Sequence, residues 1–316
     1  ISGAFYKDLS FYDTTDTLVS TVTKVDTVAS SGFIPDGFPK PSSFIAQYTI
    51  NGVLNWRVNI AGICNTTSIE LNTLTNNVII ACDFNWELNF FNASDSYMPI
   101  NDIFSDGDKD TCVIEYNQSG SIVDRFKIGG SFIDNNAKMF ILNNMLYIAG
   151  SYKSNPIKFY NTSDTFSLTQ LNNSGLFNIY VTQYDLSTKN AQWSYHIEST
   201  GNAQLGGISA ASNNTIYICG KYDNTLKFND INGDVIGQDL TNSSGYAYVF
   251  ISKYDTSGQF INRSYTIPSS AGNISVGSIF ANSDNIYMSV AFASTAIDLY
   301  NSDNLLAKSI ANLGSQ

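Results

Sequence analysis

The chain has 316 residues, with 27 acidic and 16 basic side chains and a formal net charge of −11. Its 43% hydrophobic and 13% aromatic content excludes disorder, which requires few aromatic residues and a high density of charge. The acidic balance argues against nucleic-acid binding, and no run approaches the roughly 18 apolar residues that a membrane-spanning helix requires.

Neutral polar residues take the place of charge, since the chain holds 36 Asn, 39 Ser and 24 Thr. The chain begins at Ile1 rather than Met, so we expect that a leader or a longer upstream segment has been removed.

Four cysteines are too few for a disulfide scaffold, and the sequence leaves open any pairing among Cys64, Cys82, Cys112 and Cys219. With one His and no Cys-x-x-Cys pair, zinc sites of the usual kinds are excluded.

An alternating apolar stretch that ends in Tyr opens a repeat. It occurs at residues 44–48, 112–116, 180–184 and 250–254, so the closing tyrosines are 68, 68 and 70 residues apart. A turn follows each copy, with Gly52, Gly120 and Gly258 in three copies and residues 187–190 in the other. Gly and Asn supply the positive φ angles of tight hairpin turns, so each turn predicts a second antiparallel strand.

Three further landmarks follow in each copy. The second strand is expected at residues 56–60, 124–128, 193–197 and 262–266, and the third at 78–82, 146–150, 216–220 and 286–290. An apolar-x-apolar pair comes next, as Leu88/Phe90, Ile157/Phe159, Leu226/Phe228 and Ile297/Leu299. Runs of Ile, Val, Tyr and Phe bounded by Asn, Gly, Ser and Asp indicate strands and turns.

The repeat predicts an all-β chain, a β-propeller with four-stranded blades of about 68 residues. We expect a single domain over 1–316 with four full repeats, at 43–109, 110–177, 178–247 and 248–316. Residues 1–42 are interpreted as a half blade, because Ile1–Phe5 matches Ile148–Tyr152 and Leu9/Phe11 matches Leu88/Phe90. The alternative is a β-sandwich with coincidental similarity.

Four and a half blades do not close a ring. Upstream residues could complete a fifth blade, or a neighbouring subunit could supply the missing strands. An unpaired strand edge recruits another chain by β-augmentation, so the second alternative predicts polymerisation.

The landmarks resemble the SBBP-type β-propeller repeat of secreted and surface proteins. The third copy shows the resemblance best, with Tyr180–Tyr184, Trp193, Ile216–Tyr222 and Leu226–Phe228. The resemblance covers nearly the whole chain and implies blade architecture without implying a function. The chain departs from the pattern where Asp124 and Asn262 replace Trp, and where Cys82 and Val290 replace Gly.

Two motifs could carry chemistry. Asp106, Asp108 and Asp110 have the alternating spacing of calcium loops, and the alternative is a solvated turn. His196 occupies a strand position held by Asn59 and Lys127 in other copies, which suggests a solvated face without a catalytic role. We therefore predict no catalytic residues and no cofactor, with calcium as a possibility.

The chain contains Asn-x-Ser/Thr sequons, and all but one fall in expected turns, where a glycan does not disturb a core. Asn262 lies in an expected strand. The predicted glycosylation sites are Asn65, Asn92, Asn117, Asn161, Asn172, Asn213, Asn242 and Asn273. The alternative is that Asn and Ser serve only as turn formers.

These features favour a non-enzymatic, extracellular or surface-exposed structural glycoprotein, a subunit of a filament, appendage or coat. Its partners would be other copies of itself or other surface proteins, with no nucleic acid and no membrane span. The alternative is an adhesin-like or lectin-like propeller that binds carbohydrate or protein, with Trp86, Tyr97 and Phe104 stacking on sugars.

Overall fold

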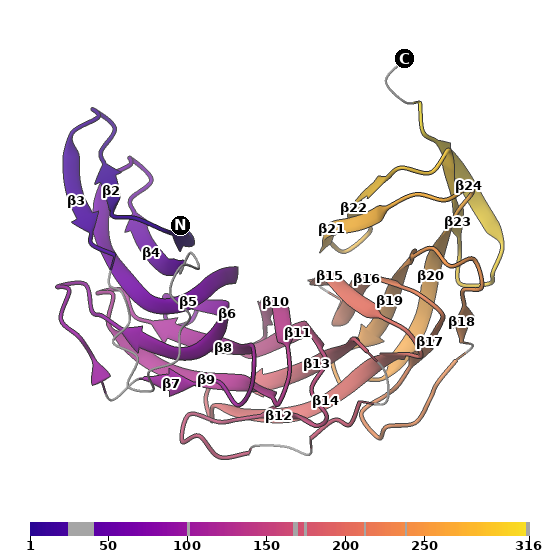
Figure 1. Cartoon of the computed structure of the whole chain (residues 1–316), viewed down its shortest axis with the longest axis horizontal. Coiled ribbons are helices and arrows are strands. Elements are labelled where there is room, and N and C mark those ends of the chain that lie inside the picture. Colours follow the sequence, from indigo (N-terminus) through magenta and orange to yellow (C-terminus); the bar gives the residue numbers. More distant parts are fainter. Residues whose placement is uncertain are drawn as a thin grey trace. The chain divides into compact units, whose positions relative to one another are not determined.

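The computed structural model describes residues 1–24, 41–99, 102–166, 170–173, 176–211, 213–237 and 239–313. These residues form strands and turns with no α-helix among them, which confirms the all-β class (Figure 1). The chain divides into two compact units, Ile1–Asn135 with Phe159–Phe166, and Asn136–Lys158 with Ser167–Gln316. Residues 25–40 of the predicted half blade lie outside the described residues, and the single domain stays a prediction.

The first unit is dominated by two long strands, β5 and β6. Its strands are β1 (Ser2–Phe5), β2 (Leu9–Tyr12), β3 (Leu18–Val22), β4 (Ser42–Tyr48), β5 (Leu54–Asn72), β6 (Asn77–Phe90), β7 (Ile103–Phe104), β8 (Asp110–Tyr116) and β9 (Ile122–Gly130). They pair in the order β1-β4-β5-β6-β8-β9, with β7 on β6 and β2 on β3. β5 therefore contains the predicted second strand, residues 56–60, and continues without a break to Asn72.

Gly62 lies just after Ile60, the last residue of β5 that pairs with β4. The pairing between β5 and β6 shifts register between Ala61 and Ile63, and Gly62 has a φ of +142°. A Cβ at this position would lie 2.5 Å from the carbonyl oxygen of Glu87. Only glycine fits at this bulge, which lets one continuous strand pair with β4 up to Ile60 and with β6 from Ile60 onward.

The second unit consists of shorter strands. They are β11 (Met145–Tyr152), β13 (Asn178–Asp185), β14 (Asn190–Ser199), β15 (Ala203–Ala211), β16 (Thr215–Tyr222), β17 (Thr225–Phe228), β18 (Leu240–Thr241), β19 (Tyr248–Asp255), β20 (Phe260–Pro268), β21 (Ile274–Ala281), β22 (Ile286–Phe292), β23 (Ala296–Tyr300) and β24 (Leu306–Ala311). β10 (Asp134–Leu142) and β12 (Ile157–Phe159) cross the boundary between the units.

The sheets of the second unit are interleaved along the chain. One six-stranded sheet has the order β10-β11-β13-β14-β17-β18, and the other has the order β15-β16-β19-β20-β23-β24. After β14 the chain forms β15 and β16 in the second sheet, returns to the first sheet with β17 and β18, and then enters the second sheet again. Each sheet is thus built from three hairpins that are separated in sequence.

The interleaving changes how the repeats relate to the sheets. The third strand of one repeat pairs with the first strand of the next, as β11 does with β13 and β16 with β19. The predicted four-stranded blade is therefore not confirmed, because the sheets of the second unit hold six strands from successive repeats. The order of strands within each repeat was predicted correctly.

The hairpin turns form as the sequence predicts. Gly52, Gly120 and Gly258 have φ angles of +79°, +74° and +84°, and Lys189 has +57° in the copy without glycine. Each hairpin shifts register just before its closing Tyr, for example between Gln183 and Tyr184. The repeated tyrosine thus marks a β-bulge beside each turn.

The core of the second unit lies between its two six-stranded sheets. Tyr195 and Phe228 of the first sheet are each 1% exposed. Tyr195 stacks on Tyr254 of β19 with ring centroids 4.4 Å apart, and Phe228 stacks on Phe260 at 5.2 Å. β21 and β22, a separate two-stranded sheet visible beside β15 in Figure 1, pack on the opposite face of the second sheet.

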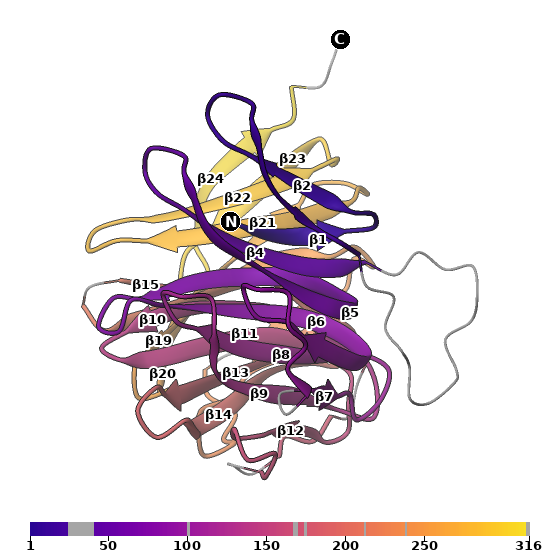
Figure 2. The same ribbon diagram turned by 90° about the vertical axis from the view of Figure 1, so that its left-hand side faces the viewer.

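The N-terminal hairpin β2–β3 covers one face of β4 and β5, and Figure 2 shows it standing beside them. Phe11 and Val22 are 6% and 1% exposed and pack against Ala46. The ring of Phe11 meets Phe44 edge-on at 5.5 Å. Residues 1–24 thus form a hairpin and a short strand, as expected of part of a blade.

Candidate functional site

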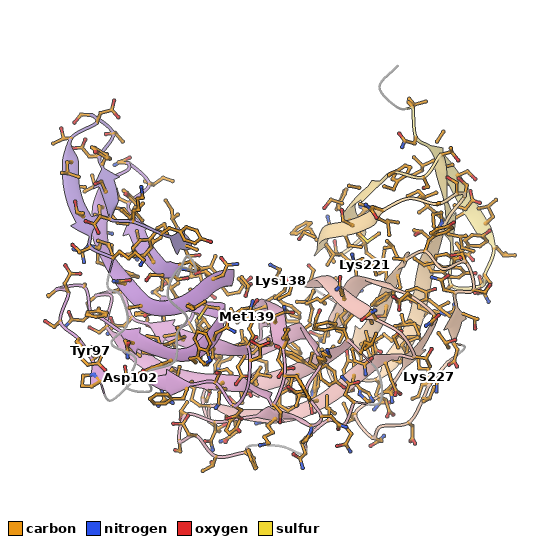
Figure 3. All side chains as sticks on the ribbon, in the orientation of Figure 1. Tyr97, Asp102, Lys138, Met139, Lys221 and Lys227 are labelled. Atoms are coloured by element: carbon orange, nitrogen blue, oxygen red, sulfur yellow. The ribbon has the colours of Figure 1, made fainter. Side chains whose placement is uncertain are left out.

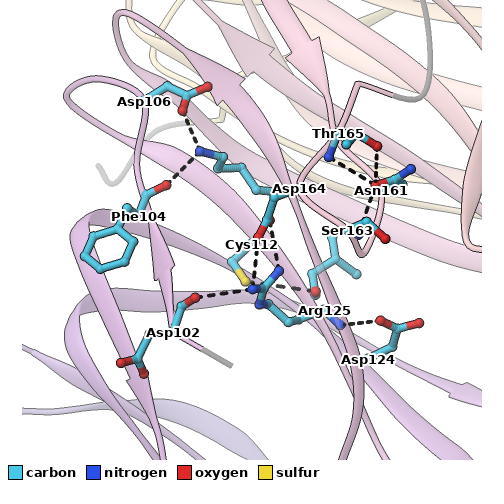
Figure 4. A network of polar contacts seen from close by, with 12 residues as sticks. Asp102, Phe104, Asp106, Cys112, Asp124, Arg125, Asn161, Ser163, Asp164 and Thr165 are labelled. Carbon is cyan, nitrogen blue, oxygen red and sulfur yellow. Dashed lines mark hydrogen bonds and ion pairs between the residues drawn. The ribbon is translucent and has the colours of Figure 1, made fainter. Parts of the chain in front are cut away.

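The most extensive polar network in the described residues holds turns against the second strand of each repeat in the first unit. Arg125 of β9 forms two hydrogen bonds to the carboxylate of Asp164, at 2.9 and 3.1 Å, and one to the Asp102 carbonyl at 3.3 Å (Figure 4). Arg57 of β5 pairs in the same way with Asp95. These bidentate pairs fix the turns in place, which is a structural role.

Asp106 belongs to a second part of this network. Lys127 donates to the Asp106 carboxylate at 2.5 Å and to the Phe104 carbonyl at 2.7 Å (Figure 4). The hydroxyl of Tyr160 also donates to Asp106, and the Lys127 ammonium lies 4.6 Å from the centroid of the Tyr160 ring. The Asp106 carboxylate is therefore neutralised by its own neighbours.

The other two aspartates of the predicted calcium motif face different partners. Asp110 is completely buried and accepts hydrogen bonds from the backbone N–H groups of Asp106 at 2.7 Å and Gly130 at 3.3 Å. Burial raises the pKa of Asp110 to about 7. Asp108 accepts from the side chain of Asn85 at 3.1 Å.

No group of three or more His, Cys, Asp or Glu side chains in the described residues is arranged to hold a metal ion. The three aspartates shape the turn before β8 instead, and calcium binding here stays a prediction.

His196 is not on a solvated face, so that interpretation was wrong. Its counterparts Asn59 and Lys127 are only 2% and 7% exposed. His196 Nδ1 lies 2.8 Å from the hydroxyl of Tyr152, and burial lowers the pKa of the imidazole. This hydrogen bond ties β14 to β11 and gives His196 a structural role.

The four cysteines are buried and unpaired. Cys82 of β6 lies directly opposite Cys112 of β8 in the strand register. Burial raises the pKa of Cys64 and of Cys219 to about 12. Thiols of this kind behave as small apolar side chains rather than as nucleophiles.

The predicted glycosylation sites differ in their surroundings. Asn117 and Asn161 head turns in which the side-chain oxygen accepts backbone N–H groups two and four residues later. Asn65 is exposed but lies in β5 rather than in the expected turn. Asn242 is 4% exposed, and its amide donates to the carbonyl of Tyr246, which argues against a glycan there in the folded chain.

Three exposed aromatic residues lie on β6, on β7 and between them. Trp86, Tyr97 and Phe104 are 40%, 47% and 55% exposed. The backbone N–H of Trp86 donates to the Ser105 hydroxyl, and the Tyr97 hydroxyl donates to Asp102, beside it in Figure 3. These are the residues that the sequence suggested for sugar stacking.

The sequence alone did not lead us to predict the arginine–aspartate pairs. Arginine recurs in the second strand as Arg57, Arg125 and Arg263, and this recurrence was a signal that could have revealed the pairs. The described residues contain no helix that is long and apolar enough to cross a membrane.

Comparison with known proteins gives no family for the chain. No protein-family model matches it, and no curated protein matches it. Among solved structures, BamB from Moraxella catarrhalis aligns with 79% of this chain and 87% of its own, at 11% identity and a TM-score of 0.25. A likeness this low carries no argument about function.

Proposed function

We propose that this chain is a non-enzymatic, extracellular structural glycoprotein that assembles with other copies of itself into a surface filament, appendage or coat. The observation that carries the proposal is the N-terminal hairpin. β2 pairs with β3 and with no other strand in the described residues, whereas its repeat equivalents β17 and β23 pair with β14 and β20. A strand of another copy that adds to this edge would join the two subunits.

The sequons support the extracellular part of the proposal. Asn117 uses its side-chain oxygen in the turn, where it accepts the backbone N–H groups of Ser119 and Ser121, so the nitrogen that would carry a glycan is not needed for these bonds. Low charge with abundant neutral polar residues suits a surface covered by glycans. The resemblance to the SBBP-type propeller repeat of secreted and surface proteins supports the same location.

Electron microscopy of the native protein, together with sedimentation at increasing concentration, tests assembly. The proposal expects polymers or regular arrays. A chain that stays monomeric at high concentration, with β2 and β3 ordered, would contradict it. Intact mass before and after enzymatic deglycosylation tests the glycans, and an unchanged mass on secreted protein would contradict that part.

The exposed rings of Trp86, Tyr97 and Phe104 favour a second candidate, a carbohydrate-binding propeller. Trp86→Ala would then weaken binding on a glycan array by about tenfold or more. Phe280→Ala is the matched control, because Phe280 is 62% exposed and lies in the other unit. Equal effects of the two substitutions, or no glycan binding by the parent chain, would remove this candidate.

A further inference from the structure

Two of the cysteines lie directly opposite each other on neighbouring strands. β6 and β8 are antiparallel, and their register places Cys82 against Cys112. Both residues are 0% exposed and belong to the same apolar core of the first unit. Directly opposed residues of an antiparallel pair point to the same face of the sheet, so the two thiols lie side by side in this core.

The spacing of such a pair suits a disulfide bond. Opposed Cα atoms in an antiparallel sheet are about 4.5 to 5.5 Å apart, and a disulfide joins Cα atoms that are about 4.4 to 6.8 Å apart. The thiol of Cys112 also forms a hydrogen bond with that of Cys82, and this bond together with burial raises the pKa of Cys82. The backbone therefore already holds the two cysteines within bonding range.

The other copies of the repeat have a different pair at the same place. Their third strand has a glycine opposite an aromatic residue of the next first strand, as Gly3/Phe44, Gly150/Tyr180 and Gly220/Phe250. In each of these pairs the ring lies over the glycine, because a Cβ at the glycine would lie 3.0 Å or less from a ring atom. In the copy formed by β6 and β8, both residues are cysteine.

The two cysteines replace this glycine–aromatic pair together. A cysteine opposite a retained ring would clash with the ring, and a glycine opposite Cys112 would leave the space of the missing ring partly empty. Two opposed cysteines avoid both faults, and they can also bond to each other. The double replacement therefore favours a bonded pair over two independent small side chains.

The remaining two cysteines are not opposed to a thiol. Cys64 shares the core with the pair but lies opposite Phe84, and its thiol donates to the Ile60 carbonyl at 3.4 Å. Cys219 lies in the second unit, opposite Ile251. The strand register therefore favours one pair among the four cysteines.

We propose that Cys82 and Cys112 form a disulfide bond that fixes β6 to β8, and that Cys64 and Cys219 remain thiols. The bond closes a loop that contains β7. This inference does not depend on self-assembly, and it takes from the proposed function only the oxidising surroundings of an extracellular protein.

Formation of the bond is a two-electron oxidation, and the oxidant is another disulfide such as glutathione disulfide. One cysteine thiolate attacks the glutathione disulfide, forms a mixed disulfide and releases one glutathione thiolate. The second cysteine thiolate attacks the protein sulfur of the mixed disulfide and releases the other glutathione, and the two released thiolates take up the two cysteine protons. Because both thiols are buried in the finished fold, this exchange takes place while the chain folds.

Refolding the full chain in a buffer of reduced and oxidised glutathione tests the pairing. The product is unfolded in a maleimide that labels free thiols, and its intact mass is expected to show two labels per chain, although the chain has four cysteines. Cleavage after glutamate, at Glu70, Glu87, Glu115 and Glu198, places each cysteine on its own peptide. The Cys82 and Cys112 peptides are expected to be linked. Four labels, or a link that involves Cys64 or Cys219, would overturn the proposal.

Two matched variants separate the pair from the other thiols. Cys64→Ala/Cys219→Ala keeps the pair, so the refolded variant should take up no label, and two labels would overturn the proposal. Cys82→Gly/Cys112→Phe restores the pair of the other copies and should take up two labels. Urea unfolding gives a second readout: closing a loop of roughly 30 residues should raise the midpoint of the parent by about 1–2 M over the chain refolded with reductant. The Cys82→Gly/Cys112→Phe variant should have one midpoint under both conditions, and a parent that behaves in this way would contradict a bond that fixes β6 to β8.

Protein from the native source distinguishes a failure of this inference from a failure of the proposed function. If the refolded chain carries the link and the native chain has four free thiols, the pairing is correct and the extracellular location is wrong. If neither carries the link, the pairing is wrong, and self-assembly is still decided by the microscopy and sedimentation described above.

Discussion

Replacing Phe228 and Leu299 by Ala tests whether equivalent positions in the two sheets of the second unit are covered differently. Phe228 is 1% exposed and contacts Phe250 and Phe260, with ring centroids 5.9 and 5.2 Å away. Truncating a buried Phe costs about 3–5 kcal/mol, because apolar burial is lost and a cavity remains. Leu299 lines an open groove, so we expect Leu299→Ala to cost about 1 kcal/mol.

Urea unfolding followed by tryptophan fluorescence measures both costs, since Trp193 packs against the core of this unit. With a slope of about 2 kcal/mol per molar urea, Phe228→Ala should lower the midpoint by about 2 M and Leu299→Ala by about 0.5 M. The measurement is made on the dissociated chain. Equal shifts for the two variants would refute the claim that Leu299 lines an open groove rather than a filled core.

Three other predictions follow from the described side chains. The raised pKa of Asp110 implies stability that is complete below about pH 4 and is lost as the pH rises through about 7, by at most about 4 kcal/mol; Asp110→Asn should flatten this dependence in pH-resolved unfolding. The lowered pKa of His196 implies stability that is lost as the pH falls below 6.5, and an NMR titration midpoint at or above 6.5 would contradict it. Peptide mapping of secreted protein should find glycan at Asn117 and none at Asn242, and a glycan on Asn242 would show that its burial is wrong.

The sequence predicts the strands well because their signals are local. The closing tyrosines, the glycine turns and the third strands all appear where the repeat placed them. Alternation and turn residues act over a few neighbours, so one copy is enough to recognise each element.

Strand pairing between repeats could not be predicted in the same way. The alternation of side chains in a third strand such as β16 does not depend on which strands lie beside it. The sequence therefore does not reveal that β16 pairs with β19 of the next repeat. The return of β17 to the sheet of β14 likewise depends on packing between distant segments. The sequence therefore predicted four-stranded blades where the structure interleaves hairpins.

The candidate sites were predicted unevenly for a similar reason. Trp86, Tyr97 and Phe104 are exposed as expected, since turns and short strands lie at the surface. His196 was misplaced because the counterparts Asn59 and Lys127 are polar yet buried through hydrogen bonds. Residue type alone does not reveal whether a polar side chain has a partner inside the fold.

Hydrogen exchange on assembled and dissociated protein tests the central claim most directly. If copies assemble through the edge of β2, backbone amides on that edge become strongly protected on assembly, while those of β24 exchange at the same rate in both states. Assembled protein in which β2 exchanges as fast as in the monomer would contradict the proposed assembly.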